Sequence, residues 1–146
     1  MDNQNIVMGG KTVLITGGTS GIGKATALAL AAMGANVVIS GRNAERAERA
    51  MEEIKGQSHN QSVDLILADL SVQSEVRRLA EAFLARHDSL DVLANNAGLV
   101  LNRRTETPDG IETTLAINHL APFLLTNLLL DRLRESAPAR IVTTSS

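Results

Sequence analysis

The sequence predicts an α/β domain in which helices cover both faces of a parallel β-sheet. Three observations favour this class. Short apolar runs alternate with longer segments of helical periodicity, the first run leads directly into a glycine-rich turn, and 44% of the 146 residues are hydrophobic. Strands that alternate with helices indicate parallel pairing through helical crossovers, and a chain of this length suits one domain.

Five runs have the length and composition of strands that are covered on both faces. They occupy residues 12–16, 36–40, 62–68, 91–94 and 141–144. The first run ends in two glycines, which marks the point where the chain must turn. The last run is the final element of the chain.

Four segments between these strands have helical periodicity. They are residues 21–33, residues 43–55, a helix capped by Ser71 with apolar positions 76, 79, 80 and 83, and residues 111–134. Gly34 is a typical helix stop after the first of them. Pro122 lies inside the fourth segment and predicts a bend there.

Right-handed crossovers between these elements predict a doubly wound, Rossmann-type parallel sheet with strand order 3-2-1-4-5. Residues 1–10 are expected to form an N-terminal tail, and residues 11–146 to form the nucleotide-binding domain. The fourth helical segment is apolar over more than one stripe. It therefore predicts a partner beyond the domain's own core, either further chain or a second subunit, and we expect a homo-oligomer through 111–134.

The glycine-rich turn has the chemistry of a phosphate cradle. Gly17, Gly21 and Gly23 follow a strand and open a helix. The first glycine allows a tight turn, the second lets the backbone approach phosphate, and the third permits close packing of helix on strand. The helix N-terminus then faces a pyrophosphate. The alternative is a glycine-rich turn that binds nothing.

The end of the second strand bears on which nicotinamide cofactor binds. An acid there would accept hydrogen bonds from a free ribose 2′-hydroxyl, whereas an arginine accommodates a 2′-phosphate. The segment reads Ile39-Ser-Gly-Arg42 and holds no carboxylate. It favours NADP(H), with NAD(H) possible, and the alternative is a solvated Arg42 that only begins a helix.

Composition excludes several other classes. The net charge of −2 argues against nucleic-acid binding, and the absence of cysteine excludes disulfides and thiolate metal sites. His59, His87 and His119 do not have metal-ligand spacing, so no metal is expected. The first ten residues have neither a basic region nor a long apolar stretch, which predicts a cytoplasmic protein without a membrane segment.

Several further motifs lie at the ends of the predicted strands and on the last helix. They are Asp69-Leu70, Asn95-Asn-Ala-Gly98, Asp109-Gly-Ile-Glu112, the helical stretch from Asn118 to Thr126, and the terminal Arg140-Ile-Val-Thr-Thr-Ser-Ser146. With the glycine loop, this combination resembles the short-chain dehydrogenase/reductase family, and most closely its retinol-dehydrogenase-like branch. The resemblance extends over essentially the whole chain from Lys11.

The resemblance implies a role for individual residues. The cofactor loop comprises Thr16, Gly17, Thr19, Ser20, Gly21, Ile22 and Gly23. The resemblance implies that Asp69 hydrogen-bonds the adenine beside Leu70, and that Asn95, Asn96, Ala97 and Gly98 brace the sheet and line the cofactor groove. Asn118 corresponds to the helix asparagine that holds a proton-relay water, and Ser146 to the catalytic serine that hydrogen-bonds the substrate carbonyl.

The family's Tyr-x-x-x-Lys motif is expected shortly after Ser146, and the chain contains no tyrosine. The interpretation is therefore the N-terminal portion of an NADP(H)-dependent oxidoreductase acting on a small carbonyl or alcohol substrate, truncated after the fifth strand and inactive as it stands. The alternative is a non-catalytic nucleotide-binding or interaction remnant.

Overall fold

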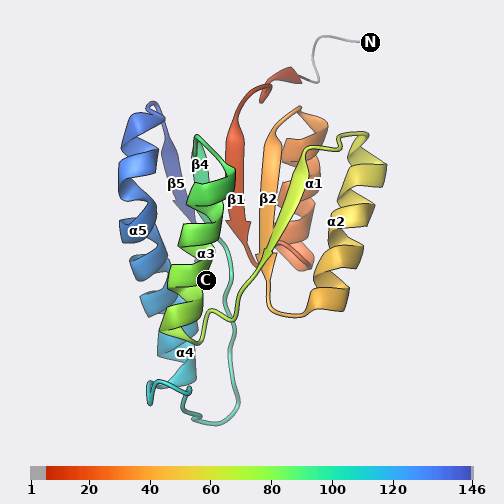
Figure 1. The fold of residues 1–146 in the computed structure, drawn as a ribbon. Helices are drawn as coiled ribbons and strands as arrows, with labels where there is room; N and C mark the ends of the chain where they lie inside the picture. The colour runs from red at the N-terminus through yellow and green to blue at the C-terminus, as the bar shows by residue number, and fades with distance from the viewer. Residues whose placement is uncertain (1–5, 146) are drawn as a thin grey trace.

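The computed structural model describes residues 6–145 as a five-stranded parallel sheet with helices on both faces (Figure 1). The strands are β1 (Thr12–Thr16), β2 (Asn36–Gly41), β3 (Val63–Leu67), β4 (Val92–Asn95) and β5 (Arg140–Thr143). Their spatial order is β3-β2-β1-β4-β5. The predicted α/β class and the predicted strand order are confirmed.

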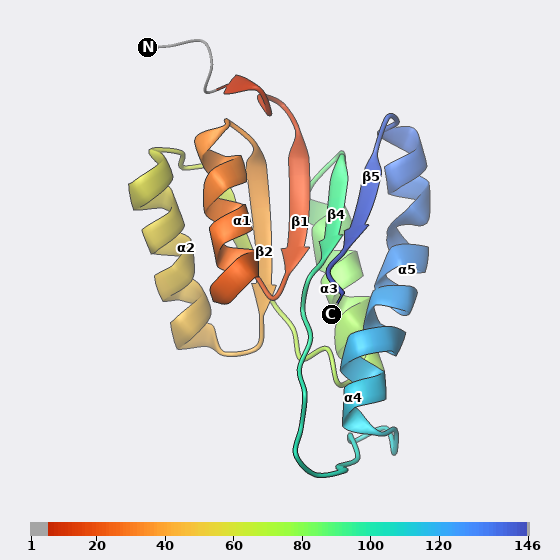
Figure 2. The ribbon, with the colours of Figure 1, turned by 180° about the vertical axis from the view of Figure 1, so that it is seen from behind.

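Two core layers lie on opposite faces of the sheet. Successive residues of β1 alternate between them, so Val13 and Ile15 face α1 (Gly21–Ala32) and α2 (Ala44–Ser58), whereas Leu14 faces α3 (Gln73–Arg86) and α5 (Ala121–Glu135). Figure 2 shows α1 and α2 together on one side of the sheet. In register, Leu14 lies opposite Val38 of β2 and Leu93 of β4. This arrangement buries both faces of the central strands.

The start of α3 differs from the sequence prediction. Val72, rather than Ser71, occupies the N-cap position and offers no side-chain capping bond. The hydroxyl of Ser71 instead donates to Asp69 at 2.7 Å, and Asp109 accepts from the N–H of Gln73 at 2.8 Å. The prediction of a Ser71 cap is therefore wrong, because a carboxylate from a distant loop binds the free amide.

The fourth helical segment is less regular than predicted. It begins at α4 (Thr113–Leu115), widens into a π-helical turn over Ala116–Leu120, and continues as α5. Pro122 lies in the first turn of α5, but α5 continues directly from the π-helical turn, so the missing N–H removes a hydrogen-bond donor to a carbonyl of that turn. The irregularity therefore precedes the proline rather than being centred on it, since the widened turn moves the preceding carbonyls away from the ring.

The C-terminal elements leave apolar surface exposed. Ile141 and Val142 of β5 are 46% and 52% exposed, and Phe123 of α5 is 64% exposed. By length and composition alone, the stretch Thr113–Glu135 could also cross a membrane. Leu125, Leu129 and Leu133 of this stretch are buried in the core against α3. The cytoplasmic location and the absence of membrane contact remain predictions.

The expected N-terminal tail is described only from residue 6 onward. The N–H of Met8 donates to the carbonyl of Met33 at 2.9 Å, so residues 6–10 follow the end of α1 before entering β1. The remainder of the predicted tail, and Ser146, lie outside the described residues.

Candidate dinucleotide-binding site

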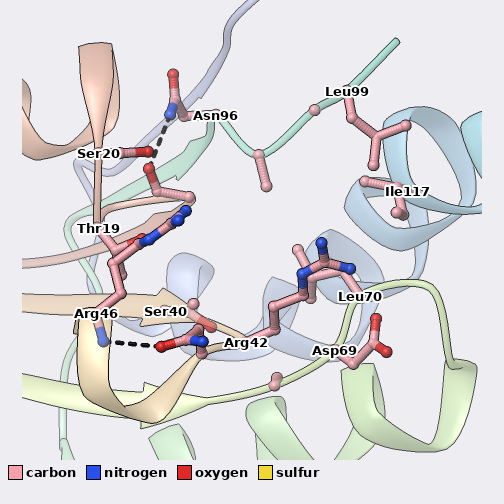
Figure 3. A pocket seen from close by; sticks show the side chains of 16 residues that line it. Thr19, Ser20, Ser40, Arg42, Arg46, Asp69, Leu70, Asn96, Leu99 and Ile117 are labelled. Atoms are coloured by element: carbon pink, nitrogen blue, oxygen red, sulfur yellow. Dashed lines mark hydrogen bonds between the residues drawn. The ribbon is translucent and has the colours of Figure 1, made fainter. Parts of the chain in front are cut away.

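A cavity of about 340 Å³ lies beyond the carboxyl ends of β1, β2, β3 and β4 (Figure 3). This is the position where open α/β sheets bind ligands, and the volume lies in the range of small-molecule sites. The structure places nine of the sequence-predicted residues in its wall: Gly17, Thr19, Ser20, Arg42, Asp69, Leu70, Asn96, Ala97 and Gly98. Segments that are distant in sequence thus converge on one cavity.

Other predicted residues support the wall without lining this cavity. The hydroxyl oxygen of Thr16 accepts the N–H groups of Asn96 and Ala97, both at 3.1 Å, and so joins the ends of β1 and β4. The amide of Asn96 donates to the carbonyl of Gly17 at 3.4 Å. Gly21, Ile22, Gly23 and Asn95 are not among the residues that line this cavity. Thr16 and Asn95 are buried, whereas Ile22 is 68% exposed.

Gly17 and Gly23 of the glycine loop are required for different reasons. Gly17 has φ of +66°, a conformation that L side chains rarely adopt, at the turn that leaves β1. Gly23 has ordinary backbone angles, but a Cβ there would lie 2.1 Å from the carbonyl oxygen of Gly17. The third glycine therefore packs the helix against the loop itself and against Asn96, rather than against the strand as the sequence suggested.

The N-terminus of α1 is suited to bind an anion. Ser20 occupies the N-cap position and makes no side-chain capping bond within the described residues, and the first turn carries no acidic side chain. The first amides of a helix have no intrahelical acceptor, and the helix dipole favours negative charge there. These N–H groups therefore offer donors to a phosphate beside Thr19 and Ser20.

Two arginines line the cavity where β2 passes into α2. In Figure 3 the guanidinium of Arg42 extends toward Leu70 and Ile117, and that of Arg46 extends toward Thr19. Within residues 6–145 neither guanidinium forms an ion pair with a carboxylate. Two cations without a protein anion make this part of the cavity electropositive.

Sequence reasoning found Arg42 but missed Arg46. A signal was present, because Arg46 follows Arg42 by four residues at the start of a helix. Asn43 is the N-cap residue of α2, and its side chain accepts the N–H of Arg46 at 2.9 Å. That cap fixes the first turn of α2 and so the direction from which Arg46 enters the cavity.

The remaining wall residues were also missed. They are Ser40, Gly41, Asn43, Ala68, Leu99 and Ile117. The hydroxyl of Ser40 is buried and has no protein hydrogen-bond partner within the described residues. Asp69 uses one carboxylate oxygen to accept from the N–H of Ser71 at 3.0 Å and from its hydroxyl, so the floor beside Leu70 is held in a fixed turn.

Asn118 lies in the π-helical turn, beside the cavity rather than in its wall. Its side-chain oxygen accepts the N–H of Leu99 at 2.9 Å, and its side-chain nitrogen donates to the carbonyl of Leu99 at 2.8 Å. The side chain therefore fixes residue 99, which lines the cavity. Pro122 has no N–H to donate to the carbonyl of Asn118 four residues earlier, so a water-holding role, which remains a prediction, would belong to that carbonyl.

A capping carboxylate fixes the start of the helix that carries Asn118. The side chain of Glu112 accepts from the N–H groups of Leu115 at 2.7 Å and Thr114 at 3.1 Å. The hydrogen bond from Leu115 is the largest influence on this carboxyl and lowers the pKa of Glu112 below its ordinary value. Within residues 6–145, no group of three His, Asp or Glu side chains is placed to hold a metal ion.

Comparisons with known proteins agree with this geometry. The family model for short chain dehydrogenases matches residues 11–146. Retinol dehydrogenase 12 of Bos taurus is 50% identical over 94% of this chain and 43% of its own length, and retinol dehydrogenase 13 of Homo sapiens is 43% identical over 94% of this chain and 41% of its own length. The chain thus spans less than half the length of these relatives.

Solved structures show the same arrangement in proteins with bound cofactor. The RhlG/NADP active-site complex of Pseudomonas aeruginosa superposes with a TM-score of 0.84 at 33% identity, covering 100% of this chain and 58% of the other. A short chain dehydrogenase of Escherichia coli CFT073 complexed with NADPH superposes with a TM-score of 0.85 at 28% identity, covering 97% of this chain and 61% of the other.

Proposed function

The chain belongs to the short-chain dehydrogenase family, in its retinol-dehydrogenase-like branch, and from this premise we propose that it forms the NADP(H)-binding part of an oxidoreductase acting on a carbonyl or alcohol group. The observation that carries the proposal is that Arg42 and Arg46, which form no ion pair within residues 6–145, line the cavity at a β2 end whose sequence holds no carboxylate. The nicotinamide supplies the hydride chemistry when bound.

The cavity fits such a cofactor on three counts. Gly21 has φ of +54°, and a Cβ built there would meet no atom within 4 Å, so the loop leaves room above the α1 amides for a pyrophosphate. The planar forks of Arg42 and Arg46 suit a 2′-phosphate. The buried hydroxyl of Ser40, which has no protein partner in the described part of the chain, offers a further polar contact in the floor.

The residues then have distinct tasks. The α1 amides and the glycine loop would bind the pyrophosphate, and Asp69 would hold the adenine side of the floor. Asn118 would orient the Leu99 segment at the rim. Ser146 would orient the substrate oxygen, as the family resemblance implies. The comparisons do not favour the alternative of a non-catalytic remnant.

The proposal is tested by titrating the chain with NADPH and NADH. Because the sequence contains no tryptophan and no tyrosine, the cofactor's own fluorescence is read without overlapping protein emission. We expect tighter binding of NADPH. Since a hydrogen bond to a charged group contributes about 1.5–3 kcal/mol, Arg42→Ala should weaken NADPH binding by about 10- to 100-fold and leave NADH binding nearly unchanged.

Arg46→Ala should produce the same selective loss to a smaller extent. Arg49→Ala is the matched control, because Arg49 lies on the same helix but pairs with Glu45 at 3.0 Å, away from the cavity. If Arg42→Ala and Arg46→Ala both leave the ratio of the two affinities unchanged, the 2′-phosphate assignment is wrong.

Binding and turnover should separate in this chain. The proton donor that the family resemblance implies is a tyrosine, and none occurs in the 146 residues. Loss of a positioned general acid typically costs about 10²–10⁴-fold in rate. We therefore expect NADPH binding without measurable NADPH oxidation in the presence of an aldehyde. Turnover on the order of 10 s⁻¹ would contradict this expectation.

A further inference from the structure

A second, much smaller cavity lies between β4 and the π-helical turn, directly beneath the floor of the dinucleotide site. Its volume is about 10 Å³, which is close to the smallest space that holds one water molecule. It shares Leu70, Ala97 and Ile117 with the larger cavity above it. Any molecule inside it would therefore contact both the floor and the helix that carries Asn118.

One wall of the small cavity carries a buried acceptor without a donor. Asn95 is 7% exposed, and its side-chain oxygen has no protein hydrogen-bond partner within the described residues. The side-chain nitrogen of Asn95 donates to the hydroxyl of Thr126 at 3.1 Å, which fixes the amide and leaves its oxygen unpaired. Buried acceptors of this kind are normally satisfied, often by an internal water.

The π-helical turn, which supplies Ile117 to the cavity lining, carries a second acceptor. In the π-helical turn, the N–H of Ala121 donates to the carbonyl of Ala116, five residues earlier. Pro122 has no N–H. The carbonyl of Ile117 therefore loses both its i+4 and its i+5 helical donors. Helical carbonyls point toward the C-terminal end, where Ala121 and Pro122 also line this cavity.

The two acceptors need a molecule with two donors in a space for a single oxygen atom. Water has two O–H groups and meets this requirement. Thr16 also lines the cavity, and its hydroxyl oxygen already accepts two backbone N–H groups, which leaves its own proton to donate. Three hydrogen bonds are the usual complement of a buried water.

We propose that one internal water molecule bridges the side-chain oxygen of Asn95 and the carbonyl of Ile117, and accepts from the hydroxyl of Thr16. It fixes the π-helical turn on the end of β4. Because Asn118 lies in the same turn and binds both backbone groups of Leu99, the water also sets the position of that segment at the rim of the dinucleotide site. Asn95 is then a positioning residue that acts through the water.

Two measurements on the chain test the site. A crystal structure should show one density peak within hydrogen-bond distance of Asn95 Oδ1 and the Ile117 carbonyl oxygen. In solution, water ¹⁷O relaxation dispersion counts long-lived internal waters. Asn95→Leu, which removes the acceptor and fills the cavity, should lose one such water and should raise the hydrogen-exchange rate of the Leu99 N–H by at least tenfold.

Asn127→Leu is the matched control, because it makes the same change at an exposed position of α5, where the side chain bonds only the Phe123 carbonyl and does not line the cavity. It should keep the water and the Leu99 protection. The proposal is overturned if the crystal structure shows other internal waters but none between these atoms, or if Asn95→Leu keeps the same number of long-lived waters. Should Asn95→Leu not fold, the wild-type density decides.

Discussion

The two halves of the sheet on either side of β1 differ in how completely they are covered. In the half with β2 and β3, Val37, Val38 and Ile39 are at most 1% exposed. In the half with β4 and β5, every residue of β5 is exposed, including the apolar Ile141 and Val142. Figure 1 shows β5 at one edge of the sheet, with α5 beside it.

We expect the two halves to have different roles, one in cofactor binding and the other in self-association. The β2 side holds the glycine loop, both arginines and the α1 amides, so most groups proposed to bind cofactor adjoin the buried strands β1 and β2. The β5 side presents an apolar strand edge and the exposed Phe123. Exposed apolar edges recruit other strands. We therefore expect this half, and not the cofactor half, to govern self-association.

The largest expected effect is at Gly23, on the side of the sheet that carries β2 and β3, which we call the covered half. A Cβ at this position would lie 2.1 Å from the Gly17 carbonyl oxygen and 2.5 Å from the Asn96 amide nitrogen, and the first of these is backbone that cannot move aside cheaply. Gly23→Ala should cost about 3 kcal/mol of unfolding free energy, lower Tm by roughly 6–12 °C, and abolish measurable NADPH binding.

Gly56→Ala is the control for Gly23→Ala. Gly56 lies inside α2, and a Cβ there meets no atom within 4 Å. The same chemical change should raise stability by about 0.5–1 kcal/mol and leave NADPH binding intact. Thermal melting and cofactor titration read both variants. Equal effects at the two glycines would show that contact with the loop does not decide the result.

The second-largest expected effect concerns the half of the sheet with β4 and β5, which we call the open half. Val142→Lys places a charge on the exposed edge, so it should weaken self-association at least tenfold, because a buried valine contributes about 1.5–3 kcal/mol to an interface. Sedimentation velocity over a concentration series measures it. Val100→Lys is the control, since Val100 is 88% exposed but lies in a loop rather than on a strand edge.

If Val100→Lys disperses the chain as well as Val142→Lys does, general solubility rather than the edge is responsible. A companion variant, Phe123→Ser, tests the expected contact through residues 111–134. If Phe123→Ser weakens self-association and Val142→Lys does not, the contact is made by α5 and not by the edge of β5. A wild-type chain that stays monomeric at all concentrations would contradict both expectations.

The covered half was also the more predictable half. Its strands, the glycine loop and the end of α1 follow from local patterns: short apolar runs, glycines after β1 and a helix stop at Gly34. Arg42 was identified because it directly follows β2. These features depend on residues that are close in sequence, so periodicity and turn chemistry are sufficient to find them.

What the sequence left unpredicted depends on distant partners. The α3 cap comes from Asp109, 36 residues from the amide that it binds, while the nearer Ser71 donates to Asp69 instead. The π-helical turn depends on where Pro122 falls relative to the packing of α5. Neither of these is encoded in a local pattern. Arg46 is the exception, because the Asn43 cap that orients it lies only three residues away and was a local signal.

The smallest expected effect lies at the other edge of the sheet, on β3. Burial raises the pKa of the Asp64 carboxyl, but a hydrogen bond from His87 at 3.0 Å, the Leu65 N–H and the Arg86 guanidinium together outweigh it. The pKa of Asp64 in the folded chain therefore lies below its ordinary value of 3.8. The β3 edge thus carries a cluster of charged and polar side chains, whereas the β5 edge carries exposed apolar side chains.

A lowered pKa in the folded state means that the ionised carboxylate stabilises the fold above pH 3.8, and that this contribution is lost as the pH falls through the folded pKa. Asp64 is 36% exposed, so solvent screening limits the effect of Asp64→Asn to about 0.5 kcal/mol at pH 7. Urea denaturation should show this difference at pH 7 and none near the acid limit of folding.

Asp131→Asn is the control, because Asp131 is 92% exposed and should change stability at neither pH. If Asp64→Asn lowers the unfolding free energy by the same amount well below pH 3.8, the loss comes from packing and not from the charge of the carboxylate.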